Sequence, residues 1–163
     1  MALRVAVLDG RLHDRAAFSC GIAALDDYLR TRASQHARDG IATTHVLTDD
    51  AAPASILGYC TLSAAQLRLH ELAEADRARL PTHPVPAMRM GRLAVATAEQ
   101  GQGHGQLLLG HAVNLALSVR GTLDVRVLIV DAKDARAAAF YRAYGFRPTA
   151  STALTLYLPL GRS

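Results

Sequence analysis

The sequence has no tryptophan, a single lysine and only two cysteines among its 163 residues. Two cysteines are too few for the disulfide framework of a small secreted scaffold, and a chain of this length does not need one. No apolar run approaches the length of about 18 residues that a membrane span requires, and residues 1–9 hold too few apolar side chains for a signal peptide. We therefore expect a cytoplasmic protein whose thiols are reduced and which has no membrane partner.

Positive charge is carried almost entirely by one residue type. The formal net charge is +4, from 18 basic and 14 acidic residues, and every basic residue except Lys133 is arginine. The planar guanidinium group of arginine matches phosphate oxygens, so a polyanionic partner such as a nucleic acid is compatible with this composition. Codon bias explains the same preference in a chain that is equally rich in alanine, so composition leaves both interpretations open.

Half of the residues are apolar and 20% are charged, which is enough apolar surface for a buried core. Apolar residues alternate in some segments, as in strands, and recur at three- and four-residue steps in others, as in helices. This patterning predicts strands at residues 3–7, 43–48, 56–62, 88–95, 125–131 and 152–158, and helices at residues 22–37, 71–80, 108–119 and 135–144. Because strands and helices alternate from end to end, we predict a single domain over residues 1–163 of the mixed α/β (α+β) class.

Glycine and proline predict where these elements end. Gly40, Gly121 and Gly145 follow helical segments and are expected to stop them. Residues 49–53 (DDAAP) predict the turn of an antiparallel hairpin between the second and third strands. Three prolines between residues 81 and 86 exclude a long helix there.

The predicted strand that ends at Val95 is followed by closely spaced glycines and then by a helix. Glycine lets the backbone turn tightly, and the N–H groups of a first helical turn attract an anion. The glycines fit neither the triphosphate loop Gly-x-x-x-x-Gly-Lys-[Ser/Thr] nor the dinucleotide motif Gly-x-Gly-x-x-Gly. They fit Gln-x-x-Gly-x-Gly through Gln100, Gly103 and Gly105, which predicts a phosphate-binding turn; an ordinary helix entry has the same order.

A second segment supports a specific family. Residues 140–146 (FYRAYGF) place an aromatic pair before a Gly-Phe turn, and Asp134 and Ala137 precede Phe140 at three-residue steps. With the glycine-rich turn at the usual separation, the chain resembles the GNAT family of N-acetyltransferases. The resemblance implies a GNAT-type acyl-CoA N-acyltransferase domain that uses acetyl-CoA as co-substrate and no metal.

The resemblance also implies which residues contact acetyl-CoA. Cofactor contacts are implied for Leu93, Ala94, Val95, Gln100, Gly101, Gln102, Gly103, His104, Gly105, Gln106 and Asp134. The first three would lie along the pantetheine arm, where a strand bulge exposes backbone groups. Asp134 stands where many members of the family have asparagine.

Further matches over roughly residues 15–160 resemble one branch of the family. They lie at residues 18–21 (FSCG), 25–29 (LDDYL), 57–63 (LGYCTLS), 80–81 (LP), 84–86 (PVP) and 91–95 (GRLAV). This branch, called TacT/AtaT, comprises toxins of type II toxin–antitoxin modules that acetylate the α-amine of aminoacyl-tRNA and so block translation. The resemblance therefore implies aminoacyl-tRNA as the acceptor, a ribbon-helix-helix type antitoxin as a partner, and the homodimers that are common among relatives.

The chain lacks an obvious general base for the acceptor amine. Residues 88–96, the strand before the glycines, contain no Asp or Glu, and Glu99 lies beyond that strand. An α-amine has a pKa of about 8 and a neighbouring ester lowers it further, whereas a lysine amine has a pKa of about 10.4. The missing base therefore favours an α-amine acceptor over a lysine side chain.

Tyr141 is the catalytic residue that the resemblance implies, because it would assist the departing CoA thiolate. A phenol has a pKa of about 10 and a thiol of about 8.5, so complete proton transfer is uphill by roughly 2 kcal/mol. We therefore expect Tyr141 to act mainly as a hydrogen-bond donor to developing negative charge. The alternative is a core aromatic side chain on a helix face.

Arg89 and Arg92 precede the glycine-rich turn and are candidates for contacts with tRNA phosphates, although solvated or structural arginines are the more common case.

Two other functions stay open: a housekeeping acetyltransferase acting on a small amine or a protein N-terminus, and a non-catalytic acyl-CoA-binding partner protein. Metal binding fits poorly, because His104 and His111 are seven residues apart and His70 has no second histidine four positions on.

Overall fold

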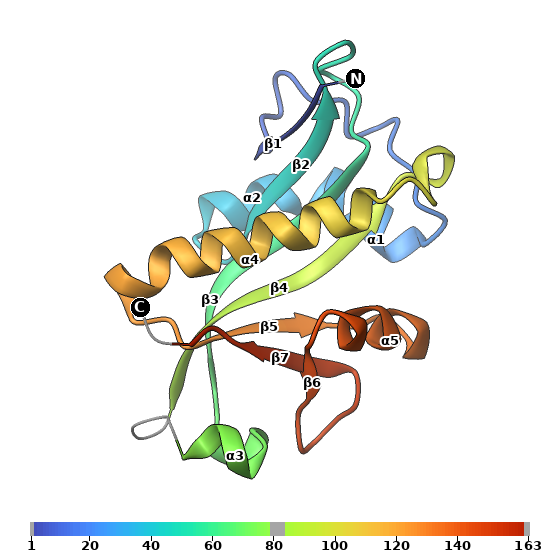
Figure 1. The fold of residues 1–163 in the computed structure, drawn as a ribbon. Helices are drawn as coiled ribbons and strands as arrows, with labels where there is room; N and C mark the ends of the chain where they lie inside the picture. Colours follow the sequence, from blue (N-terminus) through green and yellow to red (C-terminus); the bar gives the residue numbers. More distant parts are fainter. Residues whose placement is uncertain (1, 79–83, 162–163) are drawn as a thin grey trace. The chain divides into compact units, whose positions relative to one another are not determined.

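The computed structural model describes residues 2–78 and 84–161. Its strands are β1 (Leu3–Val7), β2 (Thr43–Asp49), β3 (Gly58–Leu67), β4 (Val85–Val95), β5 (Val127–Asp131), β6 (Arg147–Pro148) and β7 (Thr155–Pro159). Its helices are α1 (Ala23–Thr31), α2 (Ala33–Arg38), α3 (Glu74–Arg77), α4 (His104–Leu123) and α5 (Ala135–Ala143), with 3-10 turns η1 (Leu69–Glu71) and η2 (Thr97–Glu99). Over the described residues the strands form a seven-stranded mixed sheet in the order β1-β2-β3-β4-β5-β7-β6 (Figure 1), which confirms the predicted class.

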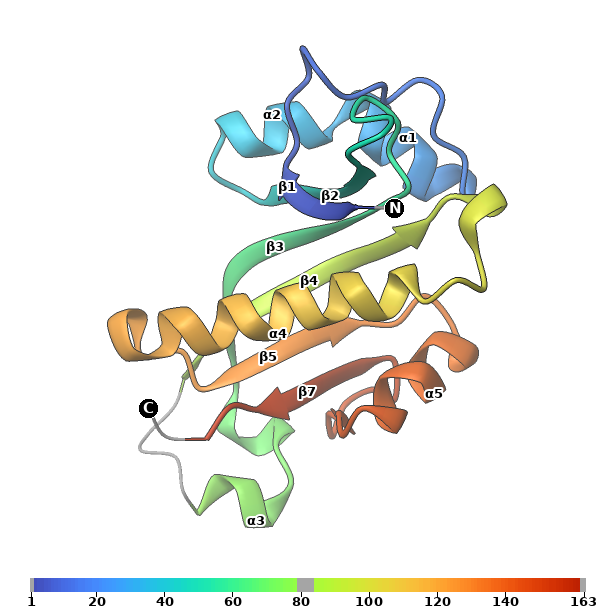
Figure 2. The same ribbon diagram turned by 45° about the horizontal axis from the view of Figure 1, so that its top comes forward.

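The chain divides into two compact units, of which the first comprises residues 1–63 and 92–112. In this unit β1, β2 and β3 are antiparallel neighbours, with Val5 opposite Leu47 and His45 opposite Cys60. Helices α1 and α2 lie beside β2 in both views (Figures 1 and 2). The core of the first unit is built from the buried side chains of Phe18, Cys20, Tyr28, Leu29, Ala33, Val46, Ile56, Tyr59 and Ala94.

The second unit comprises residues 64–91 and 113–163. Here β4 and β5 are parallel, with Met90 opposite Val130, and β5 pairs antiparallel with β7, which also pairs with the short β6. Helix α5 lies beside β7 in both views (Figures 1 and 2). The core of the second unit is built from Leu67, Leu72, Val85, Ala87, Val127, Ile129 and Tyr157. The single domain over residues 1–163 stays a prediction.

The first predicted helix is interrupted. Instead of one helix over residues 22–37, α1 ends at Thr31 and α2 begins at Ala33, because Arg32 has a φ of −123° and a ψ of −28°. The Thr31 hydroxyl donates to the carbonyl of Asp27 at 2.6 Å. A threonine that bonds back to the preceding turn bends a helix, which accounts for a break immediately after it.

The expectation that Gly121 ends its helix is wrong, because α4 continues to Leu123. Asp124 then adopts a φ of 55°, the left-handed conformation in which helices commonly stop and which aspartate tolerates better than most residues. Gly145, with a φ of 93°, does follow the end of α5 as predicted. Part of the predicted helix over residues 71–80 and one of the three prolines, Pro81, lie outside the described residues.

Other element boundaries shift. β3 begins two residues later than predicted and ends five residues later, while β4 begins at Val85 and so includes Pro86. Pro86 lacks an N–H, but its carbonyl accepts a bond from Arg126 N at 2.9 Å, so the strand tolerates it. The two-residue β6 was not predicted, because two residues carry no periodicity.

Two histidines face each other within the first unit. His111 Nε2 on α4 lies 2.9 Å from His45 Nδ1 on β2. Burial lowers the pKa of His45 to about 4, and His111 beside it adds to this effect. Burial also lowers the pKa of His111. Both rings are therefore neutral at pH 7, when one can donate a hydrogen bond to the other.

Acid is expected to destabilise the protein through this pair. The pKa of His45 is lowered from 6.5 to about 4 in the folded state. Protons therefore bind the unfolded chain more tightly, and the stability is fully present above pH 6.5 and lost as pH falls toward 4. For a half-buried, partly screened group we expect a loss of about 1–2 kcal/mol. Urea unfolding at several pH values measures it, and an H45Q/H111Q double variant with an unchanged pH slope would contradict it.

Burial also sets the state of the cysteines. Cys20 and Cys60 are both buried and are not joined to each other. Burial raises the pKa of the Cys60 thiol to about 12, so this thiol stays protonated and unreactive at neutral pH.

No helix among residues 2–78 and 84–161 is long and apolar enough to cross a membrane.

Candidate functional site

The glycine-rich segment forms an exposed turn between η2 and α4. Gly101 and Gly103 have φ values of 83° and 82°, a conformation that other L-residues avoid. The first helical bond runs from Leu107 N to the carbonyl of Gly103 at 3.2 Å, and N–H groups at the start of a helix have no carbonyl partner within it. An exposed backbone turn before a helix of 20 residues fits an anionic phosphate group.

Gln100 anchors this turn. Its side-chain amide donates to the carbonyl of Val95, where β4 ends, at 3.1 Å and to the carbonyl of Cys20 at 3.3 Å. The sequence predicted Gln100 as a cofactor contact, and the structure gives its amide group two backbone partners. The shape of the turn therefore depends on this glutamine side chain.

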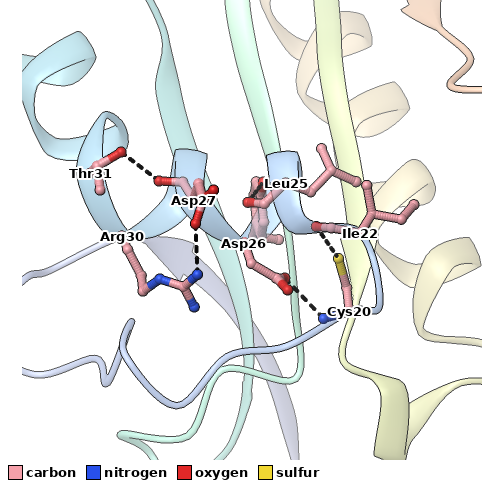
Figure 3. A network of polar contacts seen from close by, with 8 residues as sticks. Cys20, Ile22, Leu25, Asp26, Asp27, Arg30 and Thr31 are labelled. Atoms are coloured by element: carbon pink, nitrogen blue, oxygen red, sulfur yellow. Dashed lines mark hydrogen bonds and ion pairs between the residues drawn. The ribbon is translucent and has the colours of Figure 1, made fainter.

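The segment around Cys20 is itself held in place (Figure 3). The buried carboxylate of Asp26 on α1 accepts a bond from Cys20 N at 2.9 Å, and Cys20 Sγ lies 3.7 Å from the carbonyl of Ile22. The backbone of Thr97 in η2 adds a bond to the carbonyl of Ser19 at 2.8 Å. The start of α1 therefore holds the segment around Cys20 in place, and Gln100 anchors the glycine turn to that segment.

Leu93, Ala94 and Val95 form the end of β4 in the first unit. Ala94 is buried in the core, whereas Leu93 and Val95 are half-buried. The pairing of β4 with β5 is regular from Ala87 to Met90, and the bulge expected at Leu93 to Val95 stays a prediction. β4 continues to Val95, beyond the residues that pair with β5.

His104 begins α4 and is the least exposed residue of the turn, at 2%. Both ring nitrogens are buried and have no hydrogen-bond partner among the described residues. Its Nε2 lies 3.5 Å from Glu99 Oε2, and the Glu99 side chain is 29% exposed. Sequence reasoning assigned no role to Glu99 and treated His104 only as a residue of the turn. The sequence did contain a signal for this pair, because Glu99 and His104 stand on either side of the turn residues 100–103.

Tyr141 and Asp134 lie in the second unit, at opposite ends of α5. The Tyr141 side chain is 3% exposed and packs against Phe146 and Phe140, with ring centroids 5.7 and 5.3 Å apart. Asp134 is the N-cap of α5, where its Oδ1 accepts a bond from Ala137 N at 2.8 Å. The sequence had not assigned this capping role, which aspartate and asparagine both perform well.

Arg89 and Arg92 have different surroundings. In the second unit, Arg89 forms two hydrogen bonds to the carboxylate of Asp131 at 2.7 and 3.0 Å, and these bonds raise its pKa. In the first unit, the Arg92 guanidinium lies over the Tyr28 ring, 3.6 Å from its centroid. Arg92 is in none of the ion pairs found among residues 2–78 and 84–161, so its N–H groups can donate to an anion while its face stays on the ring.

The predicted site residues are divided between the two units. The first unit holds the glycine turn, Leu93 to Val95, His104 and Arg92; the second holds Tyr141, Asp134 and Arg89. No three His, Cys, Asp or Glu side chains are grouped as a metal site in residues 2–78 and 84–161.

Known proteins match almost the whole chain. Residues 40–148 match a family described as the acetyltransferase (GNAT) domain. A protein of Mycobacterium tuberculosis named tRNA-acetylating toxin is 31% identical over 145 residues, which are 89% of this chain and 85% of that protein.

Solved structures match as well. AtaT in complex with acetyl-methionyl-tRNAfMet has a TM-score of 0.89 at 28% identity, over 96% of this chain and 94% of that one. An AtaT tyrosine-to-phenylalanine mutant bound to acetyl-CoA and the C-terminus of the antitoxin AtaR has a TM-score of 0.83 at 28% identity, over 98% and 94% of the two chains.

Proposed function

Since the chain belongs to the GNAT family of acetyltransferases, we propose that it transfers acetyl from acetyl-CoA to the α-amine of aminoacyl-tRNA and so acts as a toxin that blocks translation. The observation that carries this proposal is a similarity over nearly the full chain to a tRNA-acetylating toxin and to AtaT in complex with an acetylated aminoacyl-tRNA. The chain is an acetyl-CoA-dependent acetyltransferase by family, and the toxin relatives supply the acceptor.

The glycine turn is the proposed site for the phosphates of acetyl-CoA. Its exposed glycines and the start of α4 offer backbone donors. The remaining proposed contacts are Leu93, Ala94, Val95, Gln100, Gln102, His104, Gln106 and Asp134. Of these, Gln100 acts by holding the turn in shape, and Leu93 to Val95 offer backbone groups beside the pantetheine arm. Bound there, acetyl-CoA supplies an acetyl thioester.

Tyr141 is the proposed catalytic residue. The neutral α-amine attacks the thioester carbonyl, so that a C–N bond forms and the C–S bond breaks. The Tyr141 hydroxyl donates a hydrogen bond to the negative charge that develops on sulfur. The proton lost by the amine balances the one that the thiolate gains, which makes net transfer favourable although a phenol alone is too weak an acid.

The acceptor amine needs no strong base. Residues 88–96 contain no carboxylate, and Glu99 beyond them lies 3.5 Å from His104. An α-amine next to an ester is largely neutral at physiological pH, whereas lysine is not. This absence favours aminoacyl-tRNA over a protein lysine.

Arg92 and Arg89 are the proposed phosphate contacts for tRNA, and we expect them to differ. Arg92→Gln should weaken tRNA binding about 5- to 10-fold and lower the slope of log Kd against log salt by about one, because one phosphate contact is lost. Arg89 would first have to leave Asp131, so Arg89→Gln should have the smaller effect. Fluorescence anisotropy with labelled tRNA at several salt concentrations measures both.

Arg38→Gln is the matched control, because Arg38 is an exposed arginine at the end of α2. It should leave the salt slope unchanged. An equal loss of affinity in the Arg38 and Arg92 variants would mean that the effect is one of net charge and not of a contact.

Partners and location follow from the same proposal. AtaT has been solved with the C-terminus of its antitoxin AtaR, which supports an antitoxin as a partner of this chain, and the family resemblance implies the ribbon-helix-helix type. We propose a cytoplasmic location, where charged tRNA is found, and homodimer formation as in relatives of this branch.

The test is incubation of the protein and labelled acetyl-CoA with total charged tRNA, deacylated tRNA and bulk protein. Label on charged tRNA alone is the expected result. Label on protein alone would favour a housekeeping acetyltransferase, and transfer to no acceptor would favour an acyl-CoA-binding protein. Growth arrest on expression separates a toxin from a housekeeping enzyme.

A further inference from the structure

His104 is a costly residue where it stands. An imidazole with both nitrogens buried and unbonded, as here, loses its hydrogen bonds to water without replacement. Residues between the glycines of such a turn need only fill space, which an aliphatic side chain would do without this cost. This desolvation cost indicates that the imidazole ring makes a polar contact in another state of the protein.

Glu99 is the group that could satisfy this ring. It ends η2 and His104 begins α4, so the two residues flank the turn residues 100–103. Their Oε2 and Nε2 atoms are 3.5 Å apart, slightly too far for a hydrogen bond. A protonated His104 would draw the carboxylate in and form a charged hydrogen bond across the base of the turn.

Two general effects act on a positive charge at this position. Burial disfavours a charged ring, and the positive end of the α4 dipole repels a cation at the first residue of the helix. The one carboxylate within ion-pair distance of His104 in the described residues is Glu99. The next titratable side chain along α4 is His111, which faces His45.

An anion at the start of α4 reverses this balance. Phosphate groups there neutralise the positive end of the dipole and attract a cation beneath them. We propose that His104 takes up a proton when the phosphates of acetyl-CoA bind the glycine turn, and that the resulting Glu99–His104 ion pair fixes the turn around them. This inference rests on the proposed role of the turn, and it makes acetyl-CoA binding proton-linked. His104 and Glu99 are then positioning residues.

The test compares CoA affinity across pH. We expect the affinity for CoA, measured by isothermal titration calorimetry between about pH 6 and pH 8.5, to rise as the pH falls. From the highest to the lowest pH, this rise should be up to about 10-fold larger in the unaltered protein than in Glu99→Gln or His104→Gln. The phosphates of CoA titrate equally in all three proteins, so the difference between slopes isolates the pair. Equal slopes would overturn the proposal.

A direct readout of the proton needs no turnover. Nuclear magnetic resonance of ¹⁵N-labelled histidine, with the His104 signal identified by its loss in His104→Gln, should show the ring protonated at a higher pH with CoA than without it. An identical His104 titration in both states would overturn the proton linkage. Gly103→Ala in the same calorimetric assay should weaken CoA binding; no change there would overturn the assignment of the turn itself.

Discussion

Tyr141→Phe is expected to lower acetyl transfer to aminoacyl-tRNA by about 10²- to 10³-fold, the usual cost of removing one donor to developing negative charge. The substitution removes a single oxygen from a side chain that is 3% exposed and packed between aromatic rings. The packing survives it, so CoA affinity should change less than about two-fold. Single-turnover transfer from acetyl-CoA measures the first quantity, and calorimetry with CoA the second.

Tyr144→Phe is the matched control. Tyr144 caps the same helix and is 42% exposed, so loss of its hydroxyl should leave transfer near the unaltered rate. Equal activity of the Tyr141 variant and the unaltered protein would remove Tyr141 from the mechanism. A joint loss of transfer and CoA binding would instead indicate a structural role.

Gly103→Ala is expected to weaken CoA binding by at least about 10-fold. Gly103 has a φ of 82°, a conformation that costs an L-residue about 1–2 kcal/mol of conformational free energy. In the alanine variant the backbone is expected to change conformation to relieve this strain, which moves the N–H groups that the proposed phosphate site uses. A β-carbon would meet only Gln106 Oε1 at 3.5 Å, so strain and not a clash drives the change. The affinity is measured by calorimetry with CoA.

Gly40→Ala provides a control of the same chemistry. Gly40 follows α2, has a φ of 71°, and an added β-carbon meets nothing within 4 Å. It should lower the free energy of unfolding as much as Gly103→Ala does and leave CoA affinity unchanged. If both variants bind CoA like the unaltered protein, the phosphates lie elsewhere.

The strands and the glycine turn were predictable because their signals are local. Alternation marked β1 and the hairpin of β2 and β3, and glycine spacing marked the turn whose Gly101 and Gly103 adopt left-handed conformations. The ends of helices were less predictable. Thr31 breaks a helix through a bond to its own preceding turn, and a threonine in a sequence does not reveal whether it will do so.

The partners of the site residues were out of reach for a different reason. Arg89 meets Asp131 from a strand 42 residues away, and Gln100 bonds to Cys20 over a separation of 80 residues. Such contacts depend on how strands are ordered in the sheet, and residue type alone does not specify them. The sequence predicted a set of site residues and left open whether each one binds a ligand or holds another residue in place.

The cap on α5 separates two properties that one side chain combines. Asparagine and aspartate close the start of a helix about equally well, so exchange of Asp134 for asparagine should not disturb α5, whose Ala137 N bonds to Asp134 Oδ1. The two residues differ in charge. The carboxylate stabilises the helix dipole but would repel a nearby phosphate. Aspartate at this position is therefore expected to give the helix that bears Tyr141 a firmer start, and to weaken the attraction for any phosphate that binds near it.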